Sequence, residues 1–142
     1  MHRATFVSLL VLSLAGCDSG NPELSRMPDI PTWDGLKALN QEDVMKPLVM
    51  GAQMGSDATV KEQATNPKFQ EAFSKFEKES IPLKYSTPER EAARNEVIKN
   101  LKSVIEGAKS GASAADLKSA VDAADKALRT LSSPAPAPAE KK

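Results

Sequence analysis

Residues 87–111 read TPEREAARNEVIKNLKSVIEGAKSG, and this stretch decides the predicted fold class. Thr87 is a suitable N-cap, and Pro88 occupies the first helical turn, where its missing N–H group costs no hydrogen bond. Gly107 or Gly111 marks the end of the helix. The apolar positions recur at helical spacing and are Ala93, Val97, Ile98, Leu101, Val104, Ile105 and Ala108. This stripe is wide enough to contact two neighbours, so we predict the central helix of a bundle.

A second helix is predicted over residues 66–80, NPKFQEAFSKFEKES. Asn66 is placed to cap it, and Pro67 occupies its first position. The apolar residues at the i, i+3, i+4 and i+7 positions of one face are Phe69, Ala72, Phe73 and Phe76. Core packing is the favoured interpretation, because a small bundle needs large apolar side chains to offset conformational entropy. An exposed stripe would instead mark a groove for a partner helix or an apolar ligand.

A third helix is predicted over residues 113–131, SAADLKSAVDAADKALRTL. Ser113 and Asp116 have the spacing of a capping box. The residues of its apolar face are Leu117, Val121, Ala124, Leu128 and Leu131. Its exposed side carries two predicted i,i+4 ion pairs, Asp122 with Lys126 and Asp125 with Arg129. Only a short link that contains glycine separates this helix from the preceding one, so the two should form an antiparallel hairpin.

The stretch that precedes these helices, residues 32–65, has apolar residues at helical spacing but also helix breakers. Pro47, Gly51 and Gly55 interrupt the pattern, which predicts two or three short helices rather than one. Strand-like alternation of useful length is absent from the sequence. We therefore predict an all-α fold: a small helical bundle over residues 32–131 with a C-terminal antiparallel helical hairpin.

Polar, proline-containing segments flank this domain. Residues 17–31 are rich in turn-forming residues and are interpreted as a flexible tether. Residues 132–142, SSPAPAPAEKK, are interpreted as a disordered Pro/Ala-rich tail. Lys141 and Lys142 would serve as an electrostatic anchor if the tail reached towards the cell wall, but a terminus without a specific partner is the simpler interpretation.

The N-terminal residues 1–17 read MHRATFVSLLVLSLAGC. A basic residue precedes an apolar run of roughly ten residues, which is too short to span a bilayer core of about 30 Å but is typical of a signal peptide. The last four residues, Leu14-Ala15-Gly16-Cys17, resemble the lipobox of bacterial lipoproteins. This resemblance implies cleavage between Gly16 and Cys17, so that residues 1–16 are the signal peptide. It also implies a diacylglyceryl group on the Cys17 sulfur and acylation of the new N-terminus with a fatty acid such as palmitate.

Two or three acyl chains hold a protein durably on a membrane, whereas a single chain holds it weakly. We therefore expect a protein that is lipid-anchored through Cys17 to the exported side of a cell membrane. Asp18 resembles the signal for retention in the inner membrane of enterobacteria, but this rule varies between bacterial groups. The choice between inner and outer membrane stays open.

Removal of the signal peptide would also remove His2, the only histidine, and lipidation would consume Cys17, the only cysteine. Without imidazole or thiol, the mature chain lacks the commonest metal ligands and acid–base groups and cannot form a Ser-His-Asp triad. No SxxK, GxSxG or P-loop pattern is present. We therefore expect no catalytic residue, no metal and no cofactor.

The charge of the chain does not indicate a class of partner. The chain has 19 basic and 19 acidic residues, and the two signs are interspersed, so nothing indicates binding to nucleic acid.

Three methionines lie in the irregular part of the chain: Met45, Met50 and Met54. Thioethers are ligands for Cu(I), but methionine more often fills gaps in irregular cores. Together with Phe69, Phe73 and Phe76, these residues are the candidates for a partner or ligand surface.

The leading hypothesis is a non-enzymatic, membrane-anchored lipoprotein that presents its bundle as an interaction module to an envelope protein. The alternative is a carrier that holds a small apolar ligand in an inter-helix cavity lined by the phenylalanines and methionines. An enzyme that works through carboxylates is a third and weaker hypothesis.

Overall fold

The structure is a computed structural model of the chain and describes residues 29–134, all of whose regular elements are helices. Six helices follow one another along this part of the chain: α1 (Asp34–Leu39), α2 (Met45–Gln53), α3 (Asp57–Thr65), α4 (Pro67–Lys78), α5 (Pro88–Ser110) and α6 (Ala114–Ser132). The predicted all-α bundle is confirmed. The N-terminal stretch forms three short helices, within the predicted number of two or three. Of the three predicted breakers, only Gly55 lies between helices. Pro47 and Gly51 lie inside α2, where Pro47 occupies the first turn and its missing N–H group costs no helical hydrogen bond.

Local capping interactions explain where the three longer helices begin. The side chain of Asn66 accepts a hydrogen bond from the backbone N–H of Lys68 at the start of α4. Thr87 caps α5 in the same way. Ser113 caps α6, where its hydroxyl also donates to the Asp116 carboxylate. These contacts satisfy N–H groups that have no partner within the helix.

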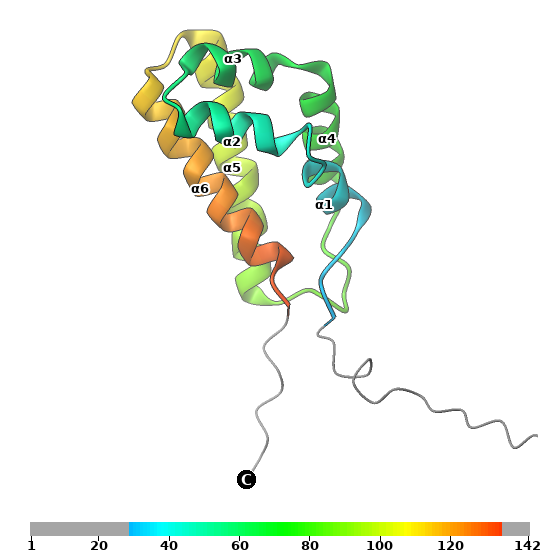
Figure 1. Cartoon of the computed structure of the whole chain (residues 1–142). Helices are drawn as coiled ribbons and strands as arrows, with labels where there is room; N and C mark the ends of the chain where they lie inside the picture. The colour runs from blue at the N-terminus through cyan, green and yellow to red at the C-terminus, as the bar shows by residue number, and fades with distance from the viewer. Residues whose placement is uncertain (1–28, 135–142) are drawn as a thin grey trace, which may run out of the picture.

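Helices α5 and α6 pack along their length as the predicted antiparallel hairpin (Figure 1). Gly111 ends α5 in the left-handed conformation, with φ of 78°, which only glycine adopts without strain. Gly107, the other predicted stop, lies within α5. Its missing Cβ leaves room for the Leu117 side chain of α6.

The short helices cover this hairpin. Helix α2 packs on α6, α3 packs on α5, and α1 packs against α4 (Figure 1). Gly35 is responsible for the close approach of α1 to α4, because a Cβ atom at this position would lie 2.9 Å from the backbone Cα of Phe76. Its backbone N–H donates to the Glu79 carboxylate just beyond the end of α4.

One continuous hydrophobic core joins the six helices. The largest of its fully buried side chains are Phe69, Phe76, Leu36, Leu39, Leu48, Leu101, Leu117 and Leu131. Trp33 and Tyr85, each 4% exposed, are also part of it.

The described chain begins and ends at the same end of the bundle, opposite the α5–α6 link (Figure 1). We call this the terminal end; it comprises residues 29–31, 81–88 and 132–134. Within the segment that the sequence predicts as a tether, Pro31 is buried and Asp29 accepts a hydrogen bond from Tyr85, so residues 29–31 contact the helical domain.

Candidate functional site

A buried arginine organises the terminal end. Arg90, in the first turn of α5, is only 8% exposed. Its guanidinium donates one hydrogen bond to the carbonyl of Tyr85 at 3.1 Å and another to the carbonyl of Ser133 at 2.9 Å. Among residues 29–134 no carboxylate lies within ion-pair distance of it. Arg90 therefore joins the start of α5 to the end of α6. We call these two hydrogen bonds of Arg90 the clasp.

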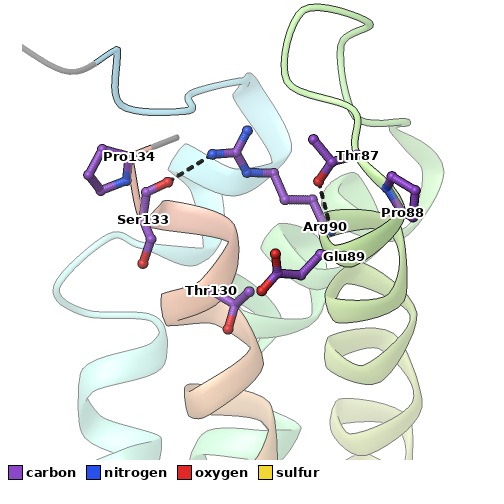
Figure 2. A pocket seen from close by; sticks show the side chains of 7 residues that line it. All are labelled: Thr87, Pro88, Glu89, Arg90, Thr130, Ser133 and Pro134. Carbon is purple, nitrogen blue, oxygen red and sulfur yellow. Dashed lines mark hydrogen bonds between the residues drawn. The ribbon is translucent and has the colours of Figure 1, made fainter. Parts of the chain in front are cut away.

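A surface hollow of about 610 Å³ lies beside this clasp. Its lining residues are Thr87, Pro88, Glu89, Arg90, Thr130, Ser133 and Pro134 (Figure 2). Figure 2 shows Glu89 directed towards Thr130, and Arg90 directed towards Ser133. The Thr87 hydroxyl accepts from the Arg90 backbone as an N-cap, so it is held by the helix rather than presented to a substrate. The hydroxyls of Thr130 and Ser133 donate to the backbone carbonyls of Lys126 and Arg129, so they too are held by the backbone of α6.

The loop between α4 and α5 completes the terminal end. The Tyr85 hydroxyl donates to Asp29 at 3.2 Å, and the Lys84 ammonium lies 4.0 Å from the same carboxylate. Lys84 also lies 4.3 Å from the centre of the Tyr85 ring. The neighbouring Tyr85 side chain, and to a smaller extent the Asp29 charge, raises the pKa of Lys84 above its ordinary value. Lys84 is therefore a cation at any physiological pH.

A second hollow, of about 370 Å³, lies between α2 and α6. We call it the α2–α6 groove. Its apolar lining residues are Met45, Val49, Met50 and Leu128. Its charged lining residues are of both signs: Glu42, Lys46, Asp125 and Arg129. Apolar side chains and charged side chains of both signs therefore lie together in this groove.

The structure separates the six residues that were candidates for a partner or ligand surface. Phe69, Phe73 and Phe76 are at most 6% exposed, and Met45 is 5% exposed. Core packing is therefore the correct interpretation for these four, because their side chains are enclosed by neighbouring helices. Met50 at 51% and Met54 at 78% are exposed and remain available as a surface.

Two carboxylates of the described residues have a pKa below the ordinary value. Lys68 lowers the pKa of Asp43 through a hydrogen bond, and Lys61 lowers the pKa of Asp57 in the same way. A general acid requires the opposite shift. Within residues 29–134, no three His, Cys, Asp or Glu side chains gather as they would around a metal ion.

The predicted lipidation and cleavage residues, Cys17 and Gly16, lie outside the described residues, as do Asp18, Lys141 and Lys142. Of the helices that are described, none combines the length and the apolar character needed to cross a bilayer.

The burial of Arg90 was not predicted, although the spacing of the sequence indicates it. Arg90 precedes Ala93 by three residues and Val97 by seven, so it lies on the buried face of α5. A basic residue on an apolar stripe near a helix N-terminus indicates a buried donor that needs carbonyl partners.

We compared the chain with known protein families, with curated proteins and with solved structures. None of the three comparisons gave a match.

Proposed function

We propose that this protein is a lipid-anchored, exported, non-enzymatic protein that presents its helical bundle to a partner protein of the cell envelope. The anchor is supported by the sequence Leu14-Ala15-Gly16-Cys17, which follows a short apolar run and contains the only cysteine. An unpaired cysteine in an exported protein requires an explanation, and acylation supplies one.

The α2–α6 groove is the observation that carries the interaction role. Met50 is half exposed in it, and the flexible, polarisable thioether adapts to the shape of a partner. Lys46 and Asp125 also line it, and charged groups at an interface favour one partner over others.

The same packing disfavours the carrier hypothesis. A carrier requires an enclosed apolar cavity, and the phenylalanines that would line it contact other core residues instead. Phe69 and Phe73 stack with their ring centres 6.5 Å apart. A ligand would have to displace these contacts.

The intact mass of detergent-extracted protein tests the anchor. We expect a chain that begins at Cys17 and carries the added mass of two or three acyl chains. A Cys17→Ser variant should leave the membrane fraction. An unmodified mass, or a Cys17→Ser variant that stays membrane-bound, would contradict the lipid anchor.

Site-specific photo-crosslinking in the native host tests the interaction role. A photoreactive amino acid at Met50 should capture one envelope protein reproducibly. The matched control is Lys99, which is exposed on α5 and does not line the groove. Equal capture from both positions, or none from Met50, would contradict the groove as the interaction surface.

A further inference from the structure

Two of the most exposed large apolar side chains lie at the terminal end. Leu83 is 94% exposed and Ile30 is 59% exposed. Met50 and Met54 are the other exposed large apolar residues of the described chain, and they belong to α2 and its C-cap. The terminal end therefore has an apolar tip of its own.

Backbone hydrogen bonds fix the conformation of the loop that carries Leu83. The carbonyl of Pro82 accepts hydrogen bonds from the backbone N–H groups of Tyr85 at 2.8 Å and Ser86 at 3.1 Å. Leu83 is the second residue of this turn, and its side chain is exposed to solvent. Buried Tyr85 fixes the turn to the core, and its hydroxyl holds Asp29, the neighbour of Ile30.

A positively charged side chain lies next to Leu83 in this turn. Lys84 follows Leu83 directly, and its ammonium lies over the Tyr85 ring. Two exposed apolar side chains with a lysine at one end of the domain match the chemistry of a bilayer surface. There the apolar groups reach the acyl boundary, and an ammonium meets lipid phosphates.

We propose that this tip, formed by Ile30, Leu83 and Lys84, rests in the headgroup layer of the membrane that anchors the chain. The inference rests on the proposed lipid anchor at Cys17. Asp29 is the twelfth residue after Cys17, which gives the connection a reach of at most about 40 Å. The terminal end is the part of the domain that this connection enters, whereas the α5–α6 link lies about 35 Å away along the 23 residues of α5.

A bilayer is a better occupant than a protein. Two apolar residues are far too few for a stable protein interface, which buries about 800 Å² on each partner. A membrane contact of this size is weak by itself. The lipid anchor holds the tip at a high effective concentration next to the bilayer, so a weak contact is sufficient to orient the domain. The α5–α6 link then points away from the membrane, and the α2–α6 groove on the side of the bundle stays open to a partner.

Fluorescence quenching by spin-labelled lipids tests the orientation. The mature chain has no cysteine besides Cys17, so Ser86→Cys gives a single labelling site in the same turn that leaves Leu83 and Lys84 intact. Ala115→Cys, exposed in the first turn of α6, is the control at the opposite end. Each protein carries an environment-sensitive dye and is reconstituted into vesicles of phosphatidylcholine and phosphatidylglycerol.

We expect quenching at position 86 to be at least twofold stronger than at position 115. Replacing the tip with L83S and K84S should reduce the quenching at position 86 to that of the control. Leu83 and Lys84 are exposed, so these substitutions leave the core intact, which circular dichroism can check. Equal quenching at the two positions, or quenching that L83S and K84S do not change, would overturn the proposal.

A second form of attachment separates this proposal from the lipid anchor. In a mature chain that carries C17S, a polyhistidine tag at the N-terminus binds nickel-chelating lipid, so the domain is tethered without acylation. The same quenching pattern is expected. If the protein proves not to be acylated but the tag-tethered chain is quenched more strongly at position 86 than at position 115, only the proposed lipid anchor is wrong. If acylated protein floats with vesicles but shows no pattern, only the membrane-facing tip is wrong.

Discussion

The guanidinium of Arg90 donates to the carbonyl of Ser133 at 2.9 Å, and this bond joins the first turn of α5 to the C-cap of α6 across 43 residues of sequence. Carbonyl groups at a helix C-terminus have no partner within the helix, so a donor from elsewhere stabilises them. Arg94, one turn later, donates in the same way to the carbonyls of Glu77 and Glu79 at the end of α4. Two consecutive turns of α5 thus hold the ends of two other helices.

Replacing Arg90 with alanine should destabilise the domain by about 2–4 kcal/mol, because hydrogen bonds to charged groups each contribute about 1.5–3 kcal/mol. Lysine should restore only part of this loss, since one ammonium does not reproduce the fork that spans both carbonyls. Urea denaturation measures the effect. The control is Arg129→Ala, which removes one surface ion pair with Asp125 and should cost less than about 1 kcal/mol. Equal losses for both variants would contradict the clasp.

Gly35→Ala should destabilise the contact between α1 and α4 by about 1–3 kcal/mol, a typical cost of overpacking. The added methyl group would meet the backbone of Phe76, which cannot move aside as a flexible side chain does. Thermal unfolding of this variant and of Lys37→Ala, an exposed change on the same helix, gives the comparison. An unchanged melting temperature for Gly35→Ala would show that α1 lies farther from α4 than described.

Phe76→Ala should destabilise the domain by about 3–5 kcal/mol, because the side chain is fully buried and its removal leaves a cavity. A residue that lined an empty ligand cavity would tolerate the change far better. The same measurement on Leu83→Ala should show a change below about 0.5 kcal/mol, since Leu83 is exposed in the folded chain. Similar losses at both positions would contradict the assignment of Phe76 to the core.

Ser113→Ala should cost about 1 kcal/mol, because the Ser113 hydroxyl accepts from the backbone of Asp116 as the N-cap of α6. Ser119→Ala, an exposed serine within the same helix, serves as the control and should have little effect. Chemical denaturation distinguishes the two. A larger loss from the control than from Ser113→Ala would exclude this capping role.

Lys68→Gln should raise the pKa of Asp43 towards its ordinary value of 3.8, because the hydrogen bond from Lys68 is the main cause of the lowered pKa. A lowered pKa in the folded state stabilises the fold above the ordinary pKa, and this stabilisation is lost as the pH falls through the lowered pKa. The difference between wild type and variant should therefore appear above about pH 4 and disappear in stronger acid. NMR titration of the Asp43 carboxyl carbon provides the measurement, and an unchanged titration curve would refute the pairing.

Local interactions explain why the helices were predictable. Asn66, Thr87 and Ser113 each cap the helix that follows through a contact two or three residues away, so the sequence alone contains the information. The phenylalanine stripe was predictable as core for a similar reason, because its spacing places all three rings on one face of α4. The lipid anchor at Cys17 is a property of sequence alone and stays a prediction.

Side-chain pairing on α6 shows where local reasoning fails. The predicted pair of Asp125 with Arg129 forms, but the predicted pair of Asp122 with Lys126 is wrong, because Asp122 bonds to Lys118 instead. Both lysines lie four residues from Asp122, on opposite sides, so sequence spacing does not decide between them.

The sequence by itself therefore determined the helices, their caps and their apolar faces, because each depends on residues within about four positions of one another. Only the tertiary structure decided that Arg90 is buried beside Ser133, that Met50 is exposed while Met45 is core, and that Ile30 and Leu83 share one end. These features join residues that are far apart in sequence or face different neighbours. They depend on how the helices pack, and the period of an apolar stripe does not specify which neighbour each part of it will meet.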